Sequence, residues 1–233
     1  WGYGGIVYQE YNAKGLNNFV NLFNEMHSAT LEMNSNILDD PLQEYYGAVG
    51  YRVGINFFRA TWESGFILIA KGYYQSISRT RETTETRWGW DGTTNYEFEL
   101  ELKNWAVGID FGYAITTFLS WKIIDGSVHF NNVSLTNTVD SPEGTIVNKY
   151  KSEPGVFGYS VGTGIIISII KDYISLEGLA AYTYLQIEDL KTDDGQFFLK
   201  LPPDAAIVSV DFGNFIDSGG FTAVVHLNIG FPL

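Results

Sequence analysis

Large apolar residues alternate with small or polar residues along much of the chain. In residues 104–115 every odd position holds a large apolar residue, whereas the even positions from 106 to 114 hold only Gly, Ala and Asp110. Successive side chains of a β-strand point to opposite faces, so this stretch predicts a strand with one bulky face and one small face. A soluble sheet would place many polar side chains opposite its apolar face. The small face fits a cramped interior instead, and the bulky face is predicted to meet lipid: Trp105, Val107, Ile109, Phe111, Tyr113 and Ile115.

The same alternation recurs and predicts eight strands. It is clear in four further stretches and weaker in three. Each stretch has about the 9 to 11 residues, or more, that a tilted strand needs to cross a membrane. The predicted strands cover approximately residues 2–11, 46–58, 65–79, 104–115, 119–132, 156–169, 174–184 and 221–233.

Short and long links alternate strictly between these strands. RATWES, TTF and KD are links of hairpin size. The long links cover approximately residues 12–44, 80–95, 133–154 and 188–220. This alternation is typical of bacterial outer-membrane barrels, in which an even number of strands leaves both termini on the periplasmic side.

With this pattern of strands and links, the chain resembles the small eight-stranded outer-membrane barrels related to outer-membrane proteins A, X and W. Its loops resemble those of the porin-family barrels of Bacteroidota. The resemblance covers the whole chain but departs at the end, where Phe231 lies two places before the terminal Leu233 instead of an aromatic residue ending the chain. It implies an all-β fold, a single eight-stranded antiparallel up-and-down transmembrane β-barrel over residues 1–233. It also implies an outer-membrane location with the long loops extracellular and both termini periplasmic.

The first long link contains a helical pattern. In GLNNFVNLFNEMHS, residues 15–28, apolar residues recur at helical spacing and asparagines lie opposite them. The pattern predicts a short amphipathic helix that caps the barrel mouth, lies at the membrane interface or docks a partner. The absence of Lys and Arg from residues 15–28 argues against a helix that lies on a lipid surface. Its apolar face is formed by Leu16, Phe19, Val20 and Phe23.

Charged residues lie at a similar height on the predicted inner faces of several strands. An eight-stranded barrel is just wide enough for its own side chains to fill it, and buried charges persist mainly when they are paired. We therefore predict that Arg52 and Lys71 pair with some of the acids and plug the bore. The alternative is a gate or a proton path through the same layer. The predicted lumen layer consists of Arg52, Lys71, Asp110, Asp125, Glu177 and His226.

Composition narrows the function classes. The formal net charge of −13 argues against sequence-independent binding of nucleic acid, which depends on Lys and Arg. The chain has no Cys, so thiolate chemistry is excluded. Apolar runs such as residues 164–170 fall short of the roughly 18 residues of a transmembrane helix. Because Trp1 opens the chain without a Met or an apolar leader, we expect a mature form whose signal peptide has been removed.

The sequence offers no catalytic or metal site. Ser134 follows His129 by five residues, which is not the close spacing of the barrel deacylases, so a polar lumen residue is the favoured interpretation of His129. The acidic pairs at 39–40 and 193–194 are not followed by further spaced ligands for Ca²⁺. No cofactor is expected.

These patterns predict a non-enzymatic outer-membrane barrel with a structural or interaction role, as an anchor for surface loops or a subunit of a larger envelope complex. The expected partners are outer-membrane lipid, lipopolysaccharide and an envelope protein. The alternative function is a narrow channel or a carrier of small solutes. A soluble lipocalin-like carrier is a third interpretation, but it requires apolar residues inside the barrel, the reverse of the pattern in residues 104–115.

Overall fold

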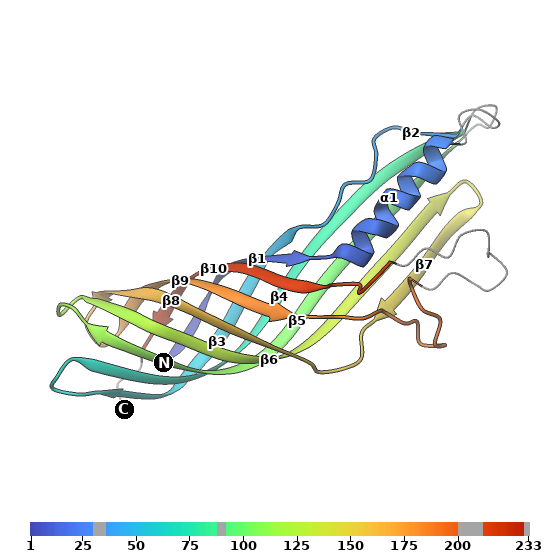
Figure 1. Ribbon diagram of the computed structural model, residues 1–233. Coiled ribbons are helices and arrows are strands. Elements are labelled where there is room, and N and C mark those ends of the chain that lie inside the picture. The colour runs from blue at the N-terminus through green and yellow to red at the C-terminus, as the bar shows by residue number, and fades with distance from the viewer. Residues whose placement is uncertain (30–35, 88–91, 200–211, 231–233) are drawn as a thin grey trace.

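Eight antiparallel strands close into a barrel in the computed structural model, which describes residues 1–29, 36–87, 92–199 and 212–230. Pairing between β4 and β5 completes the ring, so the predicted all-β eight-stranded barrel is confirmed (Figure 1). Gly2 and Ile229 are paired with each other at the end of the barrel with the short turns. Phe231 and Leu233 lie outside the described residues. The barrel strands are β1 (Gly2–Asn12), β3 (Gly47–Thr61), β4 (Phe66–Arg87), β5 (Thr93–Ala114), β6 (Leu119–Ser141), β8 (Val156–Ile170), β9 (Ile174–Leu185) and β10 (Ser218–Ile229).

Strands β4, β5 and β6 continue far beyond the barrel and form a sheet that we call the extension. The short strands β2 (Asn36–Leu38) and β7 (Gly144–Lys151) pair with β4 and β6 at its two edges. The prediction of long loops at 80–95 and 133–154 is therefore wrong, because most of these residues form paired strands. Their alternation was overlooked because in the extension the apolar side chains point inward and the polar ones outward, the reverse of the barrel pattern.

Helix α1 (Lys14–Ala29) follows β1 and packs against the inner face of the extension (Figure 1). The predicted helix is confirmed. Leu16 and Val20 are fully buried, and the rings of Phe19 and Phe23 each lie 5.8 Å from the ring of Phe98 on β5. The apolar face of the helix thus covers the extension sheet.

Asparagines on the polar side of α1 bind the extended segment 42–45. The Asn17 side chain accepts a hydrogen bond from Tyr45 N at 2.7 Å and donates one to Tyr45 O at 3.0 Å. Asn24 makes the same two bonds to Leu42, at 2.8 and 2.9 Å. Seven helical residues rise about 10.5 Å and three extended residues span about 10 Å, so the two pairs match in spacing.

Removing both of these amides should loosen the segment. We expect Asn17→Ala with Asn24→Ala to cost about 1 to 3 kcal/mol of the free energy of unfolding, because the backbone groups of Leu42 and Tyr45 lose their partners. Hydrogen exchange at these two amides should accelerate. Asn21→Ala is the matched control, since Asn21 lies on the same helix but donates to the side chain of Glu44 at 2.9 Å instead of bonding the backbone. Equal effects of the control and the double variant would contradict this role of the helix.

The main apolar core lies between α1, the extension and the described parts of the link from β9 to β10. Tyr45 is fully buried within it, and its Oη donates to Phe98 O at 2.7 Å. Burial raises the pKa of the Tyr45 phenol above its ordinary value. Among the described residues, no helix is long and apolar enough to cross a membrane. Other fully buried members of the core include Leu100, Leu135, Leu190, Phe215 and Ile216.

Candidate functional site

Charged side chains from six strands meet inside the barrel. The structure places every residue of the predicted lumen layer in the interior, with each side chain almost fully buried. Asp110, for example, is 1% exposed. They lie on the inner face because their strands alternate between inside and outside. The residues are Arg52 on β3, Lys71 on β4, Asp110 on β5, Asp125 on β6, Glu177 on β9 and His226 on β10.

Two lysines connect the three acids into one network. Lys71 Nζ lies 2.7 Å from Asp110 Oδ1 and also forms an ion pair with Asp125. Lys122 Nζ lies 2.6 Å from Asp110 Oδ2 and 3.3 Å from Asp125 Oδ2, and it pairs with Glu177 as well. Lys122 therefore contacts all three carboxylates and is the centre of the network.

Lys122 was not among the predicted lumen residues, because a β-bulge turns it inward. Regular alternation places Lys122 and Asp125 on opposite faces of β6, since they are three residues apart. The register of β6 with β8 shifts between these two residues. A bulge adds a residue to one strand, so both side chains now point inward. Ile124, between them, is exposed on the outer face.

Glu177 has two further partners on β10. His226 Nε2 lies 3.1 Å from Glu177 Oε2, and Asn228 Nδ2 donates to the same oxygen at 3.4 Å. Glu177 and His226 are directly opposite in the register of β9 and β10. The network therefore runs from β4 through β5 and β6 to β9 and β10, across the bore.

Arg52 does not join this network, so the predicted pairing of Arg52 with an acid is wrong. Its Nε and Nη2 donate to Gln75 Oε1 at 3.0 and 2.7 Å, and its guanidinium lies 4.2 Å from the centre of the Tyr73 ring. Gln75 is directly opposite Arg52 in the register of β3 and β4. Within the described chain, no carboxylate forms an ion pair with Arg52. The guanidinium instead contacts the Gln75 amide and the face of the Tyr73 ring.

His129 pairs with a residue that the sequence did not suggest. Its Nε2 lies 2.9 Å from Ser160 Oγ and 3.2 Å from Tyr73 Oη. Ser134 lies on the outer face of β6, since the adjacent Val133 is buried inside. Nucleophilic catalysis by a Ser–His pair usually needs a third group that orients the base. Among the described residues, His129 Nδ1 has no hydrogen-bond partner, and both side chains are buried.

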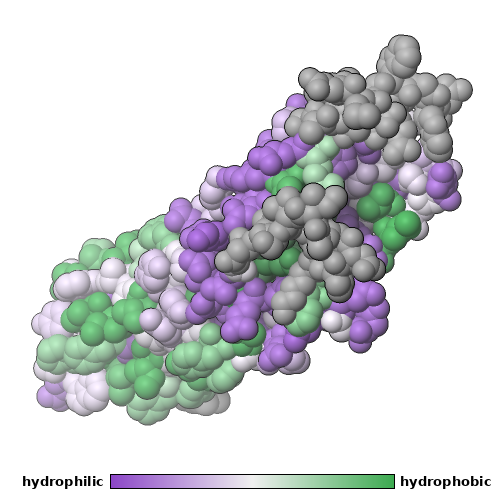
Figure 2. Space-filling view, turned by 45° about the vertical axis from the view of Figure 1, so that its right-hand side comes forward, coloured by the Kyte–Doolittle hydropathy of each residue, from purple (hydrophilic) through white to green (hydrophobic). Residues whose placement is uncertain are grey.

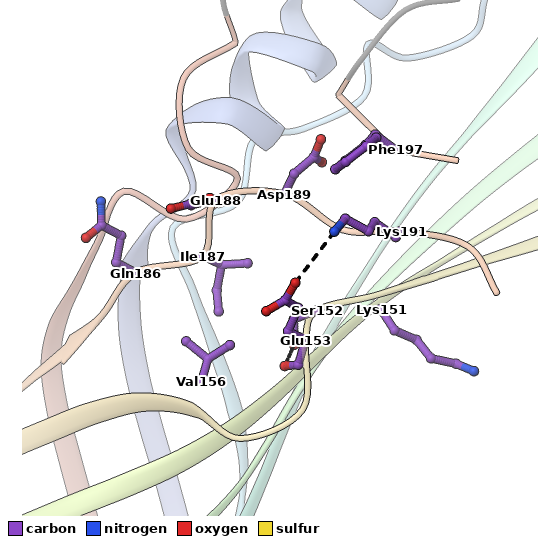
Figure 3. Close-up of a pocket in the computed structure, with 10 residues that line it drawn as sticks. All are labelled: Lys151, Ser152, Glu153, Val156, Gln186, Ile187, Glu188, Asp189, Lys191 and Phe197. Atoms are coloured by element: carbon purple, nitrogen blue, oxygen red, sulfur yellow. Dashed lines mark hydrogen bonds and ion pairs between the residues drawn. The ribbon is translucent and has the colours of Figure 1, made fainter. Parts of the chain in front are cut away.

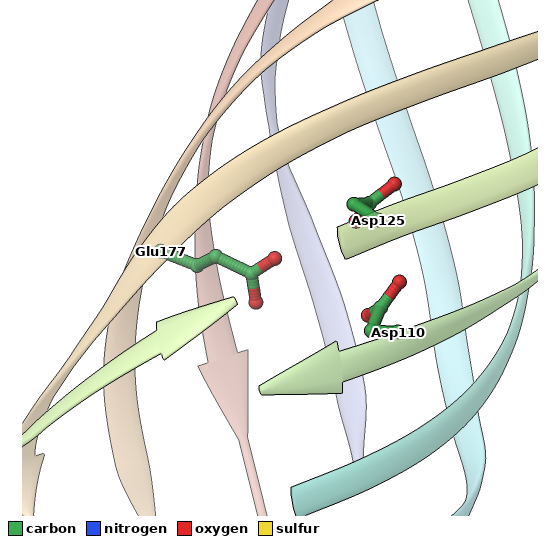
Figure 4. A group of neighbouring side chains, drawn as sticks. All are labelled: Asp110, Asp125 and Glu177. Atoms are coloured by element: carbon green, nitrogen blue, oxygen red, sulfur yellow. The ribbon is translucent and has the colours of Figure 1, made fainter. Parts of the chain in front are cut away.

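The three carboxylates come close enough to hold a cation. One oxygen of each lies within 4.8 Å of the others, and Figure 4 shows Glu177 reaching toward the two aspartates from a different strand. The ammonium groups of Lys71 and Lys122 pair with these carboxylates. The protein thus supplies its own cations at the position that a metal ion would take.

Apolar side chains close the bore on both sides of the charged network. Ile67, Ile69 and Ile166 form a buried cluster toward the short turns. On the other side of the network, toward the extension, lies a polar layer around Gln75. The main core, which includes Ile77, follows this layer. The barrel interior is therefore filled with side chains, with the ion pairs between two apolar zones.

A belt of large apolar side chains surrounds the outer face of the barrel. Figure 2 shows green residues gathered over the barrel and purple residues where the extension begins. Five of the six residues predicted to face lipid lie on this outer face of β5, from 38% exposed for Phe111 to 63% for Trp105, and the sixth, Ile115, follows the strand directly and is 53% exposed. Aromatic side chains mark its edge near the extension, where rings from neighbouring strands contact one another: Tyr51, Tyr74, Trp105, Tyr159 and Tyr184.

A pocket of about 290 Å³ lies where the link after β7 meets the link after β9 (Figure 3). Val156 and Ile187 form its apolar wall. Lys191 lies 3.6 Å from Glu153 and 4.8 Å from the centre of the Phe197 ring. Lys151, on the same lining, pairs with Asp193 outside the pocket, and the mixed charges of the lining define no particular ligand.

No family model, no curated protein and no solved structure matches the chain. The features that bear on function are therefore the barrel, its apolar belt and its filled interior.

Proposed function

We propose that the chain is an integral outer-membrane protein without enzymatic activity. The barrel spans the membrane, and the extension stands at the cell surface as a rigid platform for interaction. The observation that carries this proposal is a change of apolar face along single strands.

The apolar face of β5 changes sides between Leu102 and Trp105. Phe98, Leu100 and Leu102 point inward, and the outward positions between them are Glu99 and Glu101. From Trp105 onward the large apolar residues point outward and the inward ones are small or charged. β6 changes in the same way between Phe130 and Val133. Such a change is expected where a sheet passes from water into lipid. In water the apolar side chains are buried inside, whereas in the membrane they face outward to the lipid.

The belt has the height of a membrane. The ten residue steps from Trp105 to Ile115, at about 3.4 Å each and a tilt of about 40°, give about 26 Å. This agrees with the apolar band of about 25 Å on outer-membrane barrels. Aromatic residues at the edge of the belt are typical of the membrane interface.

The filled bore supports a structural role over the alternative of a channel or carrier. An ion crossing the barrel would have to separate buried ion pairs and pass apolar side chains on both sides. We expect the purified protein in planar bilayers to show no discrete conductance. Reproducible openings that change in the Lys122→Met variant would favour the channel instead.

The orientation can be tested with single cysteines, because the chain has none of its own. Glu143→Cys at the tip of the extension should react with an impermeant thiol reagent on intact cells. Glu63→Cys, in the turn between β3 and β4, should react only after the outer membrane is breached. Both side chains are exposed, so access alone decides the result. The opposite pattern would reverse the proposed orientation, and labelling of both sites on intact cells would contradict a spanning barrel.

A further inference from the structure

Among the described residues, no backbone group pairs with most of the outer edge of β7. Residues Lys151 and Lys191 exchange two backbone hydrogen bonds, of 2.7 and 2.9 Å, on the side of β7 away from β6. Backbone groups alternate in direction along a strand, so those of Thr145, Val147 and Lys149 point to the same side. Within the described part of the chain, no backbone partner bonds them. The described residues thus begin a ladder at Lys151 and leave three of its positions open.

Proline and a bulge, two of the usual protections, are absent from this edge. Natural edge strands are often protected by lysine, by proline or by a bulge, and β7 has only the lysines, Lys149 and Lys151. β7 contains no proline, and its register with β6 is unbroken over all eight residues. Ile146 and Val147 are each 60% exposed, on opposite faces of the strand. An added strand would cover both of these β-branched side chains.

We propose that this edge binds an extended segment of a partner protein, which pairs antiparallel with residues 145–149 and adds a strand to the extension. The partner segment has β-branched apolar residues and an acidic residue opposite Lys149. The ammonium of Lys151 is already paired with Asp193 at 2.8 Å, so Lys149 is the basic group that the edge offers the added strand. Strand addition of this kind takes its affinity from main-chain hydrogen bonds and its specificity from alternate side chains.

A second copy of the chain fits this edge poorly. Two antiparallel edge strands in a symmetric pair are related by an axis perpendicular to the sheet. The strands of the extension continue the barrel strands, so such an axis would point the two barrels in opposite directions (Figure 1). Two copies in one membrane cannot do this. This exclusion rests on the proposed membrane location, whereas the open edge does not.

The test uses synthetic peptides and the barrel reconstituted in lipid vesicles. One peptide alternates Val and Thr around a central Glu, and the other has Lys in place of Glu. We expect saturable binding of the Glu peptide, and slower hydrogen exchange at Thr145, Val147 and Lys149 when it is bound. The Lys149→Glu variant should reverse the preference between the two peptides, with a change of about fivefold for each. No binding, or a preference unchanged by Lys149→Glu, would overturn the proposal.

Proline at position 147 tests the ladder itself. The N–H of Val147 points away from β6, so Val147→Pro should keep the pairing of β6 and β7 and weaken peptide binding by at least about tenfold. Val147→Thr keeps the N–H and is the matched control. If the hairpin unfolds, as shown by fast exchange at Ile146 and Asn148, the same peptide with N-methylated amides replaces the variant and should fail to bind.

Three other results would overturn the proposal. Binding that survives both Val147→Pro and N-methylation would not be strand addition. Slow exchange at Thr145, Val147 and Lys149 in the isolated barrel would mean that the chain covers its own edge. Concentration-dependent dimers that Val147→Pro abolishes would make a second copy the occupant. Protease protection of the barrel in vesicles is measured for every variant, so loss of peptide binding is distinguishable from failure to insert.

Discussion

Lys122→Met should lower the free energy of unfolding of the barrel by about 3 to 5 kcal/mol, the largest loss among the ionisable residues of the lumen. Lys122 contacts Asp110, Asp125 and Glu177, and all four side chains are buried. Without the Lys122 ammonium, the three buried carboxylates have Lys71 as the one remaining lysine of the network, so negative charge is left uncompensated. Urea-induced unfolding in detergent or lipid vesicles measures the loss, and Met keeps most of the volume of the side chain.

Two comparisons isolate the charge. Lys122→Met with Glu177→Gln should recover a large part of the loss, because the second change removes an uncompensated acid. Arg52→Met should cost less, about 1 to 3 kcal/mol, because Arg52 bonds the neutral Gln75 and not an acid. Equal losses for Lys122→Met and Arg52→Met, or no recovery in the double variant, would show that the network is not held by these ion pairs.

Ile109→Arg should cost about 2 to 4 kcal/mol of stability in lipid vesicles, because it places a charge near the middle of the belt. Ile109 is 61% exposed, so the same change on a face in water would be nearly neutral. Thr136→Arg is the control: it lies on the outer face of β6 within the extension and should change stability by less than about 0.5 kcal/mol. A neutral Ile109→Arg in lipid would mean that the belt faces water.

The sequence predicted the barrel well because alternation is a local signal. In residues 104–115 a single stretch shows which side chains share a face, and the structure places the six large residues outside and Asp110 inside. The helix was found for the same reason, since Leu16, Phe19, Val20 and Phe23 lie within about two turns. A further local signal was available: in FELELKNWAVGI the apolar residues move from even to odd positions, which marks the end of the belt.

The extension was missed because its alternation has the opposite sense. Phe98, Leu100 and Leu102 alternate with glutamates, which is the pattern of a strand in a soluble protein. It differs from the pattern of a membrane strand, in which large apolar residues lie opposite small ones. The role of the asparagines on α1 was missed as well. Asn17 and Asn24 form a polar helix face in the sequence, but their amides bind the backbone of a segment that only the tertiary fold brings there.

The sequence by itself determined the barrel strands, their inner and outer faces and the helix, because each follows from side chains close together along the chain. The pairing inside the lumen was decided by the tertiary structure alone. A bulge of one residue turns Lys122 inward beside Asp125, and the register of β3 with β4 sets Gln75 opposite Arg52. Alternation determines the face on which a side chain lies. It does not determine which partner the side chain meets across the bore, or where a bulge occurs. Both depend on how neighbouring strands slide against one another when the ring closes, which no single stretch of sequence contains.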